Sequence, residues 1–311
     1  MRRIRPPGFL RENPSLGFFA LLCTAGSGFG QTFLIGVFGD ELRTNFELSH
    51  SLYGLLYSTA TLCAAGLLLR FGGLVDRWTL SHVTLMAAAL LAAGCLVLGG
   101  ALHAAMVWLG FFLVRFGGQA MLSHIGMSTA GRYFTAQRGK AVAFAAAGYP
   151  LSEALLPLFI SLLIMLAGWR WAWIASALIV LLALLPGLLK LSANSTHPLA
   201  ASATSTQGMQ GKTRGEVLAD PGFYLLLPAS IAVPFIVTAV LFHQVAIAAL
   251  KGWSADAFAT AFVAYGAGHL VSLLVAGPAI VATGAYGPKG FHDGVTVPPG
   301  AKAASGVSGA I

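Results

Sequence analysis

The chain has 311 residues, of which 57% are hydrophobic and only 9% are Asp, Glu, Lys or Arg. Soluble domains carry about 25% charged residues, so this composition excludes an ordinary soluble globule and a disordered chain. The apolar runs are too continuous for the alternating strands of a lipid-facing barrel. The three cysteines all lie in apolar runs without Cys-x-x-Cys spacing, which disfavours a disulfide framework or a zinc site. A helical membrane protein with several spans remains.

Eight apolar stretches are each long enough to cross about 30 Å of hydrocarbon as a helix. The first follows four arginines but is too long for the apolar core of a cleaved signal peptide, so we expect it to stay in the membrane. The predicted spans are residues 17–38, 51–71, 83–102, 104–127, 141–167, 170–190, 222–243 and 257–283.

Lysines and arginines in alternate connections predict the orientation, because cytoplasmic loops of membrane proteins collect positive charge. With the N-terminus inside, three fall outside, namely Arg43, Arg170 and Lys251. Twelve fall inside: Arg2, Arg3, Arg5, Arg11, Arg70, Arg77, Arg132, Arg138, Lys140, Lys190, Lys212 and Arg214. We therefore expect a multi-pass protein of the cell (inner) membrane with a cytoplasmic N-terminus. The net charge of +8 mostly reflects this topology, and no nucleic-acid partner is needed to explain it.

The polar stretches divide the chain into four expected parts. Residues 1–191 form a six-span bundle, 192–220 a flexible cytoplasmic linker rich in Ser, Thr, Ala and Gly, and 221–283 two further spans. Residues 284–311 have too few large apolar residues to pack, so we expect a disordered tail. All six tryptophans lie at or near predicted span ends, Trp78 inside and the others toward the outside, which predicts an interfacial aromatic belt.

Several segments of the first six spans resemble the major facilitator superfamily. The strongest is Gly72-Gly73-Leu74-Val75-Asp76-Arg77 between the second and third spans, which matches the signature loop of that family. Further matches, in chain order, are Arg115-Phe116-Gly117-Gly118-Gln119, Arg132-Tyr133-Phe134, Arg138-Gly139-Lys140-Ala141 and Gly168-Trp169-Arg170-Trp171. In the first span, Gly28-Phe29-Gly30-Gln31-Thr32-Phe33 is similar to the organic-anion branch, which holds monocarboxylate carriers and oxalate/formate exchangers.

This resemblance implies an all-α fold of two six-span bundles with a substrate site between them near the midplane. It also implies that Gly72, Asp76 and Arg77 belong to a gate that biases the inward and outward states. The alternative is that the charges of Asp76 and Arg77 only help to set the orientation of the chain in the membrane. The basic pair that follows this loop in the family is replaced here by Leu80-Ser81-His82.

The second bundle is incomplete by this resemblance. Gly72 lies 55 residues after position 17, and Gly277 lies 55 residues after position 222, where a parallel repeat should place a second signature loop. Val281 and Ala282 stand there in place of the acidic and basic pair. We therefore expect a C-terminally truncated transporter or a short variant whose unpaired second bundle is open to association with a partner.

Arg115 and Glu153 are charged residues deep in predicted spans. Each lies about eleven or twelve residues from its span start, or roughly 16 Å deep at 1.5 Å per residue. An unpaired charge there costs about 2.5–3.5 kcal/mol on insertion scales. Two interpretations stay open: the two residues form a structural ion pair, or Arg115 binds an anionic substrate and Glu153 takes a coupling proton. Gln31 follows three glycines and is a candidate hydrogen-bonding group facing a cavity, although helix packing alone can explain those glycines.

Taken together, these features predict a secondary active transporter of small organic anions that works by alternating access. Arg115 and Gln31 are the expected substrate-binding residues. The alternative is a non-transporting or degenerate membrane protein. The sequence shows no Ser-His-Asp order, H-E-x-x-H motif or Walker loop, so we predict no enzyme, no catalytic residue, no metal site and no cofactor. The expected partners are the small organic anion and the lipid bilayer.

Overall fold

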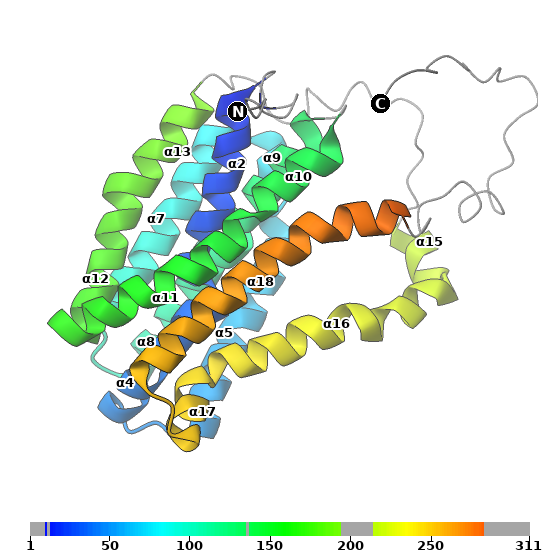
Figure 1. The fold of residues 1–311 in the computed structure, drawn as a ribbon. Helices are drawn as coiled ribbons and strands as arrows, with labels where there is room; N and C mark the ends of the chain where they lie inside the picture. The colour runs from blue at the N-terminus through cyan, green and yellow to red at the C-terminus, as the bar shows by residue number, and fades with distance from the viewer. Residues whose placement is uncertain (1–9, 11–12, 135–136, 194–213, 283–311) are drawn as a thin grey trace, which may run out of the picture. The chain divides into compact units, whose positions relative to one another are not determined.

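The structure, a computed structural model, describes residues 10, 13–134, 137–193 and 214–282. Contacts divide the chain into residues 1–270 and residues 271–311. The first unit contains the packed helices, and the described part of the second is the last stretch of helix α18. Every element of the described ranges is helical, in agreement with the predicted all-α membrane fold (Figure 1).

Seven predicted spans are confirmed, because seven described helical stretches are long and apolar enough to cross a membrane. The first is α2 (Pro14–Gly26), η1 (Ser27–Gly30) and α3 (Thr32–Val37), and the next two are α5 (His50–Phe71) and α7 (Leu80–Gly99). The fourth joins α8 (Ala104–Val114), η2 (Arg115–Leu122) and α9 (Ser123–Tyr133), and the fifth joins α10 (Arg138–Ala146) and α11 (Gly148–Ala167). The sixth joins α12 (Trp169–Ile179), η3 (Val180–Leu184) and α13 (Leu185–Ser192). The seventh is α16 (Pro221–Phe242).

Short helices connect several spans, and one longer helix follows them. They are α4 (Gly39–Asn45), α6 (Leu74–Arg77), α15 (Arg214–Ala219), α17 (Gln244–Lys251) and α18 (Ala255–Ala282). The eighth predicted span falls on α18, in which Thr260–Val275 is the described apolar stretch. Most of the expected linker, 194–213, and the expected tail from 283 onward lie outside the described residues. The three boundaries between the four expected parts therefore remain predictions.

The first span is broken at its glycine-rich segment. The α-helix gives way to the η1 turn, and Gln31 is extended, with φ −82° and ψ 156°. The break is packed tightly, since a Cβ on Gly30 would overlap the carbonyl oxygen of Val114 and lie 2.8 Å from the Gln119 nitrogen. Only glycine lets two backbones approach this closely.

The fourth span changes its winding at Arg115. Residues Arg115–Leu122 form a π-helix between two α-helical stretches. Such widened turns occur frequently at functional sites because they shift the side chains that follow them. Gly117 and Gly118 lie in this segment and face α7 and the break of the first span, where a Cβ would contact Leu91 and Gly30.

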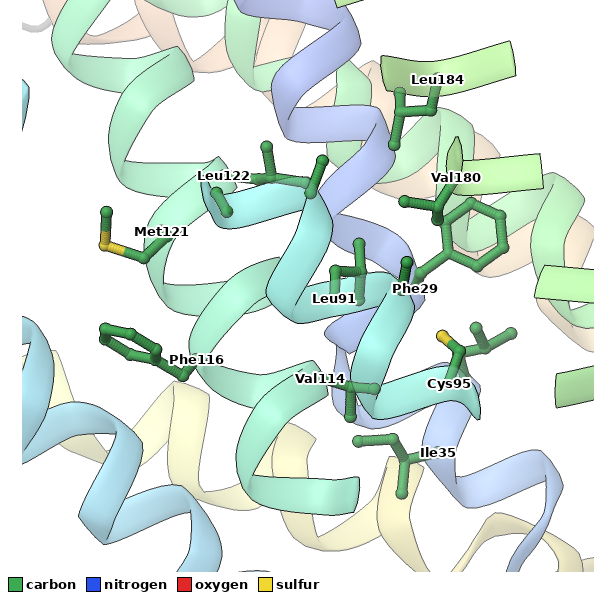
Figure 2. Packing of buried hydrophobic residues seen from close by; sticks show 14 of the residues in the cluster. Phe29, Ile35, Leu91, Cys95, Val114, Phe116, Met121, Leu122, Val180 and Leu184 are labelled. Atoms are coloured by element: carbon green, nitrogen blue, oxygen red, sulfur yellow. The ribbon is translucent and has the colours of Figure 1, made fainter. Parts of the chain in front are cut away.

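The core lies where the first, third, fourth and sixth spans meet. Phe29, Leu91, Val114 and Val180 are 5% exposed or less, and Figure 2 shows this packing. Large side chains with more than half of their surface exposed, such as Leu69 of α5, cover the outside of the helices. An apolar exterior is unfavourable in water and fits a bilayer, which confirms a protein that spans the membrane several times.

The predicted aromatic belt is wrong for two of the six tryptophans. Trp173 is 0% exposed and stacks on Phe38 with 4.2 Å between ring centroids. Trp169 is 6% exposed and lies under the guanidinium of Arg170, 4.3 Å from the ring centroid. Both residues lie near a span end in the sequence. Their helix face turns them inward, however, because a helix presents residues 169 and 173 on the same side.

Candidate functional site

Arg115 begins the π-helix of the fourth span and is 4% exposed. Its Nε donates to Thr61 Oγ1 at 3.1 Å. One terminal nitrogen, Nη1, donates to the Gly30 carbonyl at 3.2 Å and to Thr32 Oγ1 at 3.3 Å. The guanidinium also lies over the ring of Tyr57, 5.1 Å from its centroid. The Arg115 guanidinium is thus held by neutral acceptors of the first span and α5 and by one aromatic ring of α5.

The carbonyl that Arg115 binds is a product of the broken first span. Where the helix stops at Gly30, its carbonyl loses the regular helical partner and needs another donor. The hydroxyls of Tyr57 and Thr32 are 2.6 Å apart, so the threonine connects the arginine to the tyrosine. Arg115 therefore connects the break in the first span to α5.

The ion pair of Arg115 with Glu153, one of the two interpretations left open by the sequence, is not formed. No acidic side chain within the described ranges lies within 4.0 Å of Arg115, and the salt bridge of Glu153 is with His269. The residues of η1 contact both helices that carry these charges: Gly28 packs against Ser152 of α11, and Gly30 packs against Val114 and Gly118. The broken first span thus separates the two charges that the sequence placed at similar depth.

Glu153 lies on the fifth span and is 9% exposed. Its Oε2 is 2.7 Å from Nδ1 of His269 on α18. The contact is supported nearby by Gly266, where a Cβ would come within 2.9 Å of the Pro150 carbonyl oxygen and 2.8 Å of the Ala154 Cβ. Tyr265 lies one turn before His269, with 6.3 Å between the ring centroids. Glu153 and His269 therefore form a titratable pair between the fifth and eighth predicted spans.

Gln31 is half-buried at the break, and its side-chain nitrogen lies 3.5 Å from Ser27 Oγ. This is a long hydrogen bond, so the amide keeps most of its bonding capacity. Its place beside Gly30 puts it one residue from the carbonyl that Arg115 holds. Gln31 and the carbonyl that Arg115 binds therefore lie at the same break in the first span, and the assignment of both residues to a substrate site stays a prediction.

The signature loop contains the short helix α6. The carbonyl oxygen of Gly72 lies 3.1 Å from Nε2 of His124 on α9, which ties the loop to the fourth span. Arg77 is exposed at the end of α6. Asp76 has its backbone in the same helix, and its side chain lies outside the part of the chain that the structure describes. The three residues assigned to gating therefore share one loop, and their role stays a prediction.

A groove of about 500 Å³ opens beside Tyr57, between α5 and α16. Its lining is mostly apolar, with Phe242 and Pro234, and Ser58, Ser230 and Thr238 supply hydroxyls. Phe242 lies against Tyr57 with 4.3 Å between ring centroids. Tyr57 therefore contacts both the groove and the guanidinium of Arg115.

Sequence reasoning missed the neutral residues that surround the two charges. Thr32, Tyr57 and Thr61 are separated from Arg115 by more than fifty residues, and hydroxyl side chains in apolar spans give no distinctive pattern. His269 stands out in the sequence only as a histidine within a span. Nothing in the sequence indicates that it meets Glu153, because their contact joins residues 116 positions apart.

Comparison with known proteins matches most of the chain to one family. The sequence profile of the Major Facilitator Superfamily matches residues 20–290. No curated protein sequence matches the chain. One similar solved structure is the crystal structure of a Glu→Gln mutant of the peptide transporter POT in complex with alafosfalin, with 17% sequence identity and a TM-score of 0.49. That match covers 81% of this chain and 49% of the other, so the chain spans about half the length of that transporter.

Proposed function

This chain belongs to the major facilitator superfamily, and on that basis we propose that it acts in the secondary active transport of small organic anions by alternating access. One observation carries the proposal. Arg115 is a 4% exposed cation with no carboxylate within 4.0 Å among the described residues. A buried charge without a counter-ion is costly, and a bound anion removes much of that cost. The natural ligand for such a site carries one negative charge.

The groove beside Tyr57 supports a substrate with an apolar part. A carboxylate needs the guanidinium, whereas an aliphatic or aromatic group gains from contact with Phe242 and Pro234. Movement of the Tyr57 ring would join the groove to Arg115. Gln31 can then donate from its amide to the second carboxylate oxygen.

The first test is a binding assay on the purified chain in detergent. We expect small monocarboxylates to raise its thermal unfolding midpoint, because a ligand that binds only the folded state stabilises it. Uncharged amides of the same acids serve as matched controls and should produce no shift. Proteoliposomes then test whether the same anions are taken up saturably. Absence of any carboxylate-specific shift in a folded sample would contradict the proposal and favour a non-transporting membrane protein.

Glu153 is proposed as the proton-coupling residue. A proton there cancels one charge when the anion brings another into the apolar site. His269 of α18 contacts Glu153 directly, and Tyr265 lies beside His269. Tyr149 lies one helical turn before Glu153 on α11, and its hydroxyl is paired with Ser123.

We expect carboxylate binding to strengthen on acidification by up to about tenfold per pH unit, the limit for linkage to one proton. Glu153→Gln mimics the protonated carboxyl, so its binding should be as tight as the acid limit and should lose most of this pH dependence. Carboxylate titrations at several pH values, followed by thermal shift, measure both effects. The Glu153→Asp variant keeps the titrating group and is the matched control. An unchanged pH slope in Glu153→Gln would rule out this role.

The gating role of Gly72, Asp76 and Arg77 and the cytoplasmic N-terminus in an inner membrane remain proposals, supported by the signature loop and by the lysine and arginine count. Association through the second bundle is supported by α16, whose side chains Leu225, Val233 and Phe235 are 66–80% exposed. No catalytic residue, metal or cofactor is proposed, since members of this superfamily are transporters.

A further inference from the structure

A small polar cavity lies where α4, the start of α5 and the junction of α16 with α17 meet. It has a volume of about 20 Å³ and is lined by Arg43, His50, Tyr53 and His243, among others. None of its lining residues is among those that hold Arg115. The charge count of the sequence predicts that this end of the bundle faces the outside. Phe242 and His243 line both this cavity and the groove beside Tyr57, so the cavity adjoins that groove and differs from it in its polar lining.

Two buried hydrogen-bond donors at this cavity have no partner. Tyr53 is 2% exposed, and its hydroxyl makes no hydrogen bond. The Nε of Arg43 is likewise buried and unpaired. Buried polar groups are nearly always satisfied, and the guanidinium Nε–H can only donate. The two residues therefore call for a shared acceptor in the cavity that both of them line.

The electrostatic surroundings favour an acceptor with negative charge. Arg43 is a permanent cation, and two helices begin at the cavity: α5 at His50, and α17 with Val245 and Ala246 in its first turn. Helix N-termini carry partial positive charge. The imidazoles of His50 and His243 lie near each other, with 6.5 Å between ring centroids.

Asp40 is the one acidic residue of the lining. Its carboxylate lies 3.9 Å from the Nη1 of Arg43, and the side chain is 72% exposed. A largely exposed carboxylate at this distance is well screened by water, so it compensates the arginine only weakly. The Arg43 side chain is itself 23% exposed, so water screens part of its charge, but its buried Nε–H still has no acceptor.

We propose that this cavity is a binding site for one halide ion, with chloride as the physiological ligand. Chloride accepts hydrogen bonds from the Tyr53 hydroxyl and from Arg43 Nε–H. A single water needs about 10–15 Å³ of cavity volume, so about 20 Å³ has room for one small ion and little room for a carboxylate of several atoms. The bound ion ties α4 and α5 to the junction of α16 and α17.

The test is chloride NMR on the purified full chain in detergent, where binding to the protein broadens the line of the free ion. Ionic strength is held constant with sodium gluconate, whose anion is too large for the cavity. We expect excess broadening that bromide displaces. Tyr53→Phe and Arg43→Gln should each weaken chloride binding about tenfold or more, because each removes a buried donor and the second also removes the charge.

Matched controls come from helices that border the cavity. Tyr224→Phe removes an exposed hydroxyl of α16, and Arg70→Gln removes an exposed charge at the other end of α5, so both should bind chloride as the unmodified chain does. Arg115→Gln should also leave chloride binding unchanged, which separates this site from the proposed transport function. If the unmodified chain does not broaden the chloride line, or if bromide does not remove the broadening, the proposal is overturned. Water would then fill the cavity. The proposal is equally overturned by undiminished broadening in a folded Tyr53→Phe variant.

Discussion

Replacing Arg115 by glutamine will abolish stabilisation by small carboxylates and lower their affinity by at least about tenfold, the usual consequence of losing a charge-assisted hydrogen bond. The glutamine amide nitrogen ends about where Arg115 has its Nε, so it can still donate to Thr61 Oγ1, whereas the Gly30 carbonyl loses the donor that Nη1 supplied at 3.2 Å. Arg115→Lys keeps the charge and loses the planar fork, and we expect intermediate affinity. Thermal unfolding with and without each carboxylate measures both quantities.

Replacing an arginine that only supports the structure should have a different effect on carboxylate binding. Arg170 is such a residue and serves as the comparison for Arg115. The Nη1 of Arg170 donates to the carbonyls of Gly99 at 3.3 Å and Ala101 at 2.6 Å, which is backbone bracing without an anion site. Arg170→Gln should lower the unfolding midpoint and leave the carboxylate-induced shift intact. If Arg115→Gln behaves in the same way, the anion does not bind at Arg115.

Substituting Gly30 by alanine will strongly destabilise the bundle, although it adds only one methyl group. The added Cβ would overlap the Val114 carbonyl oxygen and lie 2.8 Å from the Gln119 nitrogen. Both are backbone atoms of the fourth span, so relief requires separating two helices and not merely turning a side chain. We expect a loss of about 1–3 kcal/mol or more, together with weaker carboxylate binding, because the Gly30 carbonyl positions Arg115. Thermal unfolding in detergent reports the first effect and ligand titration the second.

Gly66→Ala is the matched control for this steric effect. Gly66 lies in α5, and an added Cβ there would meet no atom within 4 Å. Alanine is a better helix former than glycine, so we expect unchanged or slightly higher stability. Wild-type stability of Gly30→Ala would show that the backbones of the first and fourth spans are not in direct contact at Gly30.

The apolar runs and turn residues determined most of the fold. Seven of the predicted spans are helices close to their expected limits, since about twenty apolar residues in a bilayer have almost no alternative to a helix. The signature loop and the other short motifs pointed to the family that the sequence profile then matched over residues 20–290. Arg115, Gln31 and Glu153 were singled out because charged and amide groups are rare in hydrocarbon.

Only the tertiary structure decided which of these groups meet. Depth along the membrane normal can be counted from the sequence, and it put Arg115 and Glu153 at one level. The rotation of each helix about its axis cannot be counted, because it depends on packing at positions such as Gly28 and Gly30. That packing gave Arg115 neutral partners and gave Glu153 a histidine. It also turned Trp173 into the core. Span length and depth follow from local hydrophobicity, whereas side-chain partners follow from contacts between residues far apart in the chain.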